Sequence, residues 1–152
     1  METSRGARLA SQLLRAFTAM SAEVTDDLAG RGHPGATPAL HFAMEAIEHG
    51  ASDASALGRA LGISRQAAAK TIRSLEDLGY VDRGVDEGDA RRRPLQVTER
   101  GRDWTALGAA AFERILERLE TSEGAEHVAV LEQLLGRIPE ITSPGADASL
   151  PG

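Results

Sequence analysis

The chain has 152 residues, of which 41% are hydrophobic and only 3% aromatic, and its net charge at pH 7 is −6. This composition excludes a chain that is disordered throughout and favours a core of packed Ala- and Leu-rich helices. No cysteine is present, which excludes disulfides, thiolate metal sites and thiol redox sensors. No stretch approaches the roughly 18 apolar residues of a membrane span, and no secretion signal is visible, so we expect a cytoplasmic protein without membrane contact.

The first 50 residues predict two helices. Apolar residues recur at steps of three and four over residues 5–29, which indicates one long amphipathic helix. The stripe consists of Leu9, Leu13, Phe17, Met20, Val24 and Leu28. After a Gly-rich loop at residues 30–35, Thr37 and Pro38 have the order of an N-cap and a first-turn proline. A second helix should therefore begin there and end near Gly50.

The next segment predicts two helices joined by a tight turn. The short helix covers residues 53–61, with Asp53 as its N-cap. The turn falls at residues 62–63. A longer helix covers residues 64–78, because Ser64 can cap it and Gly79 is a suitable residue for its C-terminal end.

Two short strands and two further helices complete the prediction. The strands cover residues 80–83 and 95–97, and a loop rich in Gly, Asp and Arg between them indicates a β-hairpin with a charged tip. Thr98 should cap a long helix. The last helix covers about residues 123–137, and the tail from Pro139 has too few apolar residues to fold, so we expect it to be disordered.

Basic residues are concentrated in this central region. Residues 58–102 contain ten Arg or Lys and seven Asp or Glu, a net charge of +3, which leaves −9 for the rest of the chain. DNA would therefore be attracted to the middle of the chain and repelled by its ends.

The polar side of the helix at residues 64–78 is a candidate reading surface for DNA. A single helix fits the major groove, and the residues in its first turn reach the base edges. Arg65 and Gln66 can bond to guanine and adenine, while Lys70 and Arg73 lie further along, where phosphates are the expected partners. The predicted DNA-contacting residues on this helix are Ser64, Arg65, Gln66, Ala69, Lys70 and Arg73.

The hairpin tip is a second candidate DNA contact. An Arg there can enter the narrow, electronegative minor groove. We assign this role to Arg91, with Asp89 orienting its guanidinium group. Arg92 and Arg93 are also predicted to contact DNA.

These motifs, in this order, resemble the MarR (multiple antibiotic resistance regulator) family. The resemblance covers residues 57–101. It rests on the segments Leu57 to Leu61, Gly62-Ile63-Ser64-Arg65-Gln66-Ala67-Ala68, Leu75-Glu76-Asp77-Leu78-Gly79-Tyr80-Val81, Asp89-Ala90-Arg91 and Val97-Thr98-Glu99-Arg100-Gly101. Three residues depart from the family pattern. Gly58 replaces an alanine, Val97 replaces a leucine, and Pro94 should make the second strand short or place it at an edge.

The resemblance implies a mainly α fold with a small β-hairpin, in which a winged helix-turn-helix domain is flanked by dimerisation helices. In a single domain of residues 1–152, residues 36–98 would form the DNA-binding lobe, residues 5–33 and 99–138 the dimerisation helices, and residues 139–152 a disordered tail. It also implies a homodimer bound to double-stranded DNA and a small-molecule effector between the helical layer and the lobe. His41 and Trp104 are the residues that we expect to line that effector pocket.

The expected function is therefore a transcription regulator, in the first place a ligand-responsive repressor. The alternative is a winged helix used for protein interactions, which the acidic ends of the chain would suit. We expect no enzyme, because no catalytic constellation is present. We also expect no cofactor and no metal site, since the four histidines (His33, His41, His49 and His127) form no cluster with carboxylates at the spacing of metal ligands. The individual roles of these histidines stay open.

Overall fold

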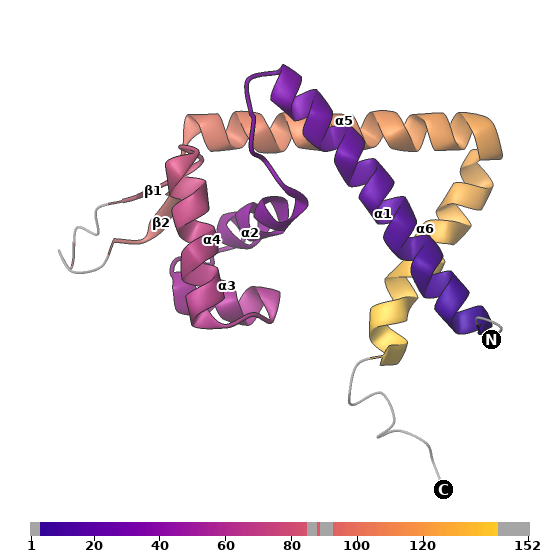
Figure 1. Cartoon of the computed structure of the whole chain (residues 1–152), viewed down its shortest axis with the longest axis horizontal. Helices are drawn as coiled ribbons and strands as arrows, with labels where there is room; N and C mark the ends of the chain where they lie inside the picture. The colour runs from indigo at the N-terminus through magenta and orange to yellow at the C-terminus, as the bar shows by residue number, and fades with distance from the viewer. Residues whose placement is uncertain (1–3, 85–87, 89–92, 143–152) are drawn as a thin grey trace, which may run out of the picture. The chain divides into compact units, whose positions relative to one another are not determined.

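The computed structural model describes residues 4–84, 88 and 93–142. The chain divides into two compact units, residues 1–112 and 113–152. The helices and strands of the described residues are α1 (Arg5–Gly30), α2 (Pro38–Glu48), α3 (Ala54–Leu61), α4 (Arg65–Asp77), β1 (Val81–Arg83), β2 (Leu95–Val97), α5 (Glu99–Glu123) and α6 (Ala125–Thr142), as Figure 1 shows. This order confirms the predicted fold class, which is mainly α with a small β-hairpin.

Local hydrogen bonds explain why the central helices begin where the sequence predicts. Thr37, Asp53 and Ser64 are the N-caps of α2, α3 and α4, and each side-chain oxygen accepts a hydrogen bond from the backbone N–H three residues further on. These bonds satisfy N–H groups that have no partner inside the helix. All three predicted caps are therefore confirmed.

The C-terminal end of α4 leads directly into the hairpin. Gly79 has a φ of 76°, and the N–H groups of Gly79 and Tyr80 donate to the carbonyls of Glu76 and Leu75. This pair of bonds is the Schellman motif, which needs a left-handed residue at the position of Gly79. The motif uses the backbone N–H of Tyr80, so the strand begins at Val81, one residue later than predicted.

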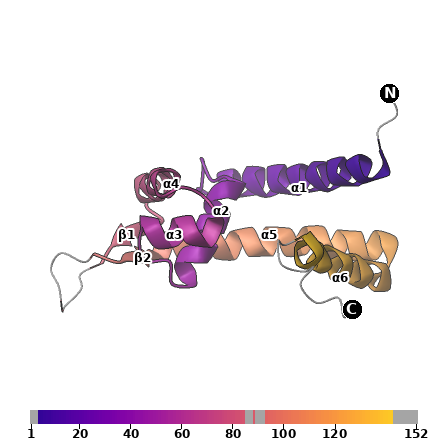
Figure 2. The same ribbon diagram turned by 90° about the horizontal axis from the view of Figure 1, so that it is seen from below.

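The hairpin is antiparallel, with Val81 opposite Val97 and Arg83 opposite Leu95. Each strand has three residues, and Pro94 directly precedes β2. The prediction that this proline would leave a short strand is confirmed. Figure 2 shows the strand pair beside α3 and α4, next to the start of α5.

The core of the first unit lies between α2, α3, α4, the hairpin and the start of α5. Its largest fully buried side chains are Trp104, Tyr80, Met44, Leu57, Ile72 and Leu75. Ala68, Ile72 and Leu75 lie along one side of α4, as their spacing predicts. The opposite side of α4 is consequently left free of core contacts.

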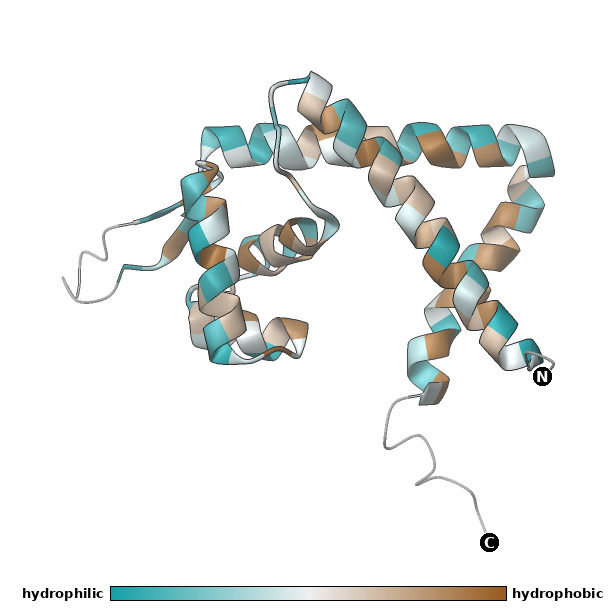
Figure 3. Ribbon diagram, in the orientation of Figure 1, coloured by the Kyte–Doolittle hydropathy of each residue, from teal (hydrophilic) through white to brown (hydrophobic). Residues whose placement is uncertain are grey.

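Both α1 and α6 carry repeated apolar residues, which appear as brown segments along each ribbon in Figure 3. On α1, Val24 and Leu28 are buried, whereas Leu9, Phe17 and Met20 of the same predicted stripe are exposed. On α6, the exposed apolar residues are Val130, Leu131, Leu134, Leu135 and Ile141. Isolated apolar residues on a surface are ordinary, but repeated ones along a helix are typical of an interaction face.

The predicted end of the last helix was wrong. We expected disorder from Pro139, but α6 continues through this residue to Thr142. A proline inside a helix removes one backbone donor and normally bends or ends the helix, which is why the sequence predicted an end here. Here the Thr142 hydroxyl donates to the carbonyl of Ile138 at 2.8 Å. Residues 143–152 lie outside the described residues. In the part of the chain that the structure describes, no helix is long and apolar enough to cross a membrane.

Candidate nucleic-acid interface and ligand pocket

The turn between α3 and α4 packs closely and leads into the exposed first turn of α4. Gly62 has a φ of 66°, a left-handed conformation that suits glycine. Gly58 is buried, and a Cβ atom there would lie 2.9 Å from the carbonyl oxygen of Ile63. The glycine thus gives the turn room to pack closely against α3, a role that the sequence pattern alone did not indicate.

The predicted reading residues lie on the solvent side of α4. Arg65, Gln66, Lys70 and Arg73 are exposed, and Ala69 is half-buried. Ser64 is also exposed, but its hydroxyl oxygen accepts the N–H of Ala67 at 3.0 Å. In the described chain Ser64 therefore acts as a cap, and its hydroxyl can additionally donate to a phosphate.

An open hollow brings several of these residues together with one that the sequence did not single out. Its rim is formed by Asp53, Ala54, Arg65, Gln66, Ala69, Arg73 and Arg83. Arg83 is the last residue of β1, and its Nε donates to Oε1 of Glu76 at 2.9 Å. The alternation of strand residues could not have revealed it, since it places Arg83 on the same face as the buried Val81, whereas Arg83 is exposed. Lys70 does not belong to this rim.

The predicted wing residues are only partly described. Arg93 is exposed and lies just before β2. Asp89, Arg91 and Arg92 lie outside the described residues, so their predicted roles stay predictions.

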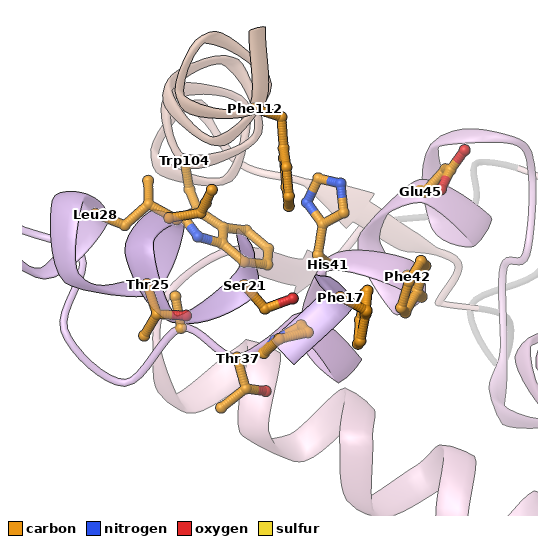
Figure 4. Close-up of a pocket in the computed structure, with 13 residues that line it drawn as sticks. Phe17, Ser21, Thr25, Leu28, Thr37, His41, Phe42, Glu45, Trp104 and Phe112 are labelled. Carbon is orange, nitrogen blue, oxygen red and sulfur yellow. The ribbon is translucent and has the colours of Figure 1, made fainter. Parts of the chain in front are cut away.

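A cavity of about 250 Å³ lies in the first unit, between α1, α2 and the first part of α5 (Figure 4). Its wall includes both predicted pocket residues, His41 and Trp104. The spacing of the sequence did not connect these two residues with Phe17, Phe42 and Phe112, which complete a set of five rings around the cavity. The remaining wall is formed by Ser21, Val24, Thr25, Leu28, Ala36, Thr37, Pro38 and Glu45.

The rings contact one another across the three helices. The ring centroids of Phe17 and Phe42 are 6.1 Å apart and stacked. His41 is 6.0 Å from Trp104 in a T-shaped contact and 6.0 Å from Phe112. These distances are typical of attractive aromatic pairs. The cavity is therefore mostly apolar, with aromatic faces and edges turned toward its interior.

Two buried polar atoms on this wall have no partner among the described residues. They are the hydroxyl oxygen of Ser21 and the indole nitrogen of Trp104, whose side chains are 6% and 1% exposed. In Figure 4 the Ser21 hydroxyl points into the space between Trp104 and Phe17. Buried polar atoms usually have a hydrogen-bond partner, so partnerless atoms beside a cavity indicate a place where a bound molecule supplies one.

A polar cluster around the buried His33 gives this residue a structural role. Its Nδ1 is 3.2 Å from the hydroxyl of Tyr80, and its Nε2 is 3.0 Å from Oδ2 of Asp103. Burial away from water raises the pKa of Tyr80 above 10.0, and the nearby Arg100 guanidinium opposes this shift. The cluster joins the loop after α1 to the hairpin and to α5.

The other two histidines lie at helix ends on the surface. The Nδ1 atoms of His49 and His127 are each 2.7 Å from the carbonyl oxygen four residues earlier. Among the described residues, no group of three or more His, Asp or Glu is placed to hold a metal ion.

Comparison with known proteins relates the chain to one family. Residues 35–92 match the model of the MarR family. No curated protein sequence matches the chain.

Solved structures of the same family share the fold. The crystal structure of a MarR family protein from Mycobacterium tuberculosis is 27% identical, covers 88% of this chain and 98% of its own, and superposes with a TM-score of 0.61. The structure of that protein in complex with salicylic acid aligns at 21% identity over 90% and 97% of the two chains, with a TM-score of 0.63. A crystal structure of MarR aligns at 22% identity over 88% and 96%, with a TM-score of 0.69. Residues 35–92 are thus similar to the MarR family, and the chain shares the fold of solved structures from that family.

Proposed function

We propose that this protein is a sequence-specific DNA-binding regulator that acts as a homodimer in the cytoplasm and represses its target until a small molecule binds. The observation that supports DNA binding best is the exposed side of α4, where Arg65, Gln66 and Arg73 surround one hollow with Arg83. Four polar or cationic side chains on one face, with the apolar side of the helix buried, match what a major-groove reading helix requires.

The wing would supply the second contact of each subunit with DNA. On this proposal Arg91 enters the minor groove, Asp89 orients it, and Arg92 and Arg93 hold phosphates. Residues 36–98 would form the DNA-binding lobe, with residues 5–33 and 99–138 serving dimerisation.

The uncovered apolar residues support the dimer. Leu9, Phe17 and Met20 on α1 are exposed, as is a row of leucines on α6. A second copy of the chain would remove these side chains from water, at about 25 cal/mol for each Å² of apolar surface. A two-fold dimer reads half-sites about one helical turn apart, so the operator should be a pseudo-palindrome.

The cavity beside His41 and Trp104 supports the effector role. It is enclosed by aromatic rings and contains a few polar groups, as small-molecule sites usually do. The relative from Mycobacterium tuberculosis has a structure in complex with salicylic acid. We propose that the cavity of this chain is its effector site and that occupancy changes the position of the reading helix.

Selection of bound fragments from the source genome, followed by mobility-shift assays with excess competitor DNA, tests the DNA-binding proposal. We expect a pseudo-palindromic site. Arg65→Ala and Gln66→Ala should change which bases are preferred, whereas Arg91→Ala should weaken binding to all sequences and lower the salt dependence. Arg15→Ala removes the same charge from α1, outside the hollow, and serves as the control.

Two outcomes would contradict the proposal. If competitor DNA abolished all binding, a protein-interaction role of the winged helix would be the better explanation. If all three variants bound the selected site like the wild type, the reading surface would be assigned to the wrong residues. A monomer in analytical ultracentrifugation at the concentrations used would contradict the dimer.

A further inference from the structure

We infer that the cavity between α1, α2 and α5 selects small aromatic cations and discriminates against organic anions. This inference rests on the proposed effector role of the cavity and specifies the chemical class of its ligand. It follows from three properties of the wall: its charge, its rings and its unpartnered hydroxyl.

The charge of the wall disfavours an anion. Glu45 is the acidic residue of the described lining, and no Lys or Arg occurs among the lining residues that the structure describes. A carboxylate taken out of water needs an opposite charge or several donors to offset its lost hydration. The Glu45 carboxylate at the rim would instead repel an anionic ligand.

The same charge favours a cation. Glu45 is exposed at the rim of the cavity, so its carboxylate can attract a positive ligand without itself being buried. In Figure 4 the side chain stands beside Phe42, to one side of the ring cluster. Attraction at such an exposed position is modest, and its expected contribution to affinity is about 3- to 10-fold.

The rings supply a further part of the selectivity. Phe17, Phe42, Phe112 and Trp104 turn aromatic surface toward the cavity from three helices. The face of an aromatic ring carries partial negative charge, and cages of such rings bind quaternary ammonium groups. The volume of about 250 Å³ limits the ligand to one or two rings.

The buried polar atoms specify a further feature of the ligand. The Trp104 indole nitrogen can only donate a hydrogen bond, while the Ser21 hydroxyl can donate or accept. Both atoms lack a partner among the described residues. The preferred ligand should therefore be an aromatic amine that also carries one neutral acceptor, such as a carbonyl or hydroxyl group.

Three simple probes separate charge from shape. Phenyltrimethylammonium and tert-butylbenzene have nearly the same shape and differ by one positive charge, and salicylate provides the anion. Trp104 is the only tryptophan of the chain, so the tryptophan fluorescence comes from one residue on the cavity wall. Isothermal titration calorimetry of the full-length protein, without DNA, gives the affinities independently of any fluorescence change.

We expect phenyltrimethylammonium to bind about 10-fold more tightly than tert-butylbenzene, and salicylate to bind most weakly. Glu45→Gln should weaken the cation by about 3- to 10-fold and leave the neutral probe unchanged. Glu48→Gln is the matched control, because Glu48 is an exposed acid on the same helix that does not line the cavity. It should change neither affinity.

Several results would overturn the inference. It would fail if the cation and its neutral isostere bound with equal affinity, or if salicylate bound most tightly. It would also fail if both glutamate variants lost the same affinity for the cation, or if no probe bound. Salicylate binding that disappeared in His41→Gln would show that the imidazole serves as a cation for acids. Because the titrations contain no DNA, their failure leaves the DNA-binding proposal intact, and a failed mobility-shift assay leaves the ligand preference intact.

Discussion

The indole of Trp104 lies flat against the phenol ring of Tyr80, with 4.6 Å between the ring centroids and 6° between the ring planes. Trp104 belongs to the wall of the cavity, whereas Tyr80 directly precedes the first strand of the hairpin. One rigid stack therefore joins the proposed effector site to the base of the wing. Any displacement of the indole by a ligand would have to move the phenol or break the stack.

The buried phenol predicts a loss of stability at alkaline pH. Because the pKa of Tyr80 in the folded protein is raised above 10.0 by burial, the unfolded chain ionises first as the pH rises. Below pH 10 the phenol is protonated in both states and its contribution is complete. Above that pH the unfolded state binds fewer protons, so the free energy of unfolding falls. Urea unfolding at a series of alkaline pH values measures this slope.

Tyr80→Phe is the control for the alkaline prediction. The variant should lose this part of the pH dependence, although its stability at neutral pH should fall by about 1–3 kcal/mol because Nδ1 of His33 loses its partner. Tyr80 is the only tyrosine, so the ultraviolet absorbance of tyrosinate reports its ionisation directly. Ionisation of the folded protein at or below pH 10 would contradict the expected shift.

Two glycines of α5 should respond to alanine in opposite directions. A Cβ atom at Gly101 would overlap the carbonyl oxygen of Tyr80, so Gly101→Ala must push α5 away from the hairpin. Overpacking of this kind costs about 1–3 kcal/mol, and more where backbone has to move. At Gly108 the nearest atoms would be 3.9 and 4.0 Å away, which is ordinary contact. Gly108→Ala should therefore stabilise the helix by about 0.5–1 kcal/mol.

Chemical denaturation of the wild type and both variants measures these differences in stability. The midpoint should fall for Gly101→Ala and rise for Gly108→Ala. Equal effects would mean that helix propensity alone governs both positions and that the close approach of α5 to the hairpin is not a constraint.

The helix starts could be predicted from the sequence because local bonds determine them. Asp53 and Ser64 cap helices whose first N–H groups lie only three residues away. The end of α6 was predicted wrongly at Pro139, because the rule that a proline ends a helix did not hold here and the helix continues to Thr142. Local rules therefore gave the element order and most boundaries, but not every helix end.

The candidate sites were harder to predict because they depend on residues far apart in the chain. His41 and Trp104 were expected to line a pocket only through the family resemblance. Phe17 joins them from α1, and no spacing rule connects it with residues of α2 and α5. Phe112 lies on the same helix as Trp104, about two turns further on. Arg83 was missed for a similar reason, since its place beside α4 depends on how the hairpin follows the end of that helix.

Thr98 should be a stabilising link between the hairpin and α5. Its hydroxyl donates to the carbonyl of Gly79 at 2.6 Å and accepts the N–H of Gly101 at 3.0 Å. Thr98→Ala removes both bonds, and we expect a loss of about 1 kcal/mol, as for other N-caps. Thr98→Ser keeps the hydroxyl and should recover most of it. Thermal unfolding followed by circular dichroism would show the order wild type, Ser variant, Ala variant, and similar values for both variants would contradict the role of the hydroxyl.

Arg83 should add to the electrostatic attraction for DNA without reading its sequence. Its Nε donates to Glu76, and the residue lies at the rim of the hollow together with Arg65 and Arg73. Each phosphate contact releases condensed counterions, so losing one lowers the slope of log affinity against log salt concentration by about one. Arg83→Ala should show this decrease on specific and unrelated duplexes alike, whereas Arg15→Ala should not. A change in base preference with an unchanged slope would instead mean that Arg83 reads bases, and the reading surface would then have to include the hairpin base.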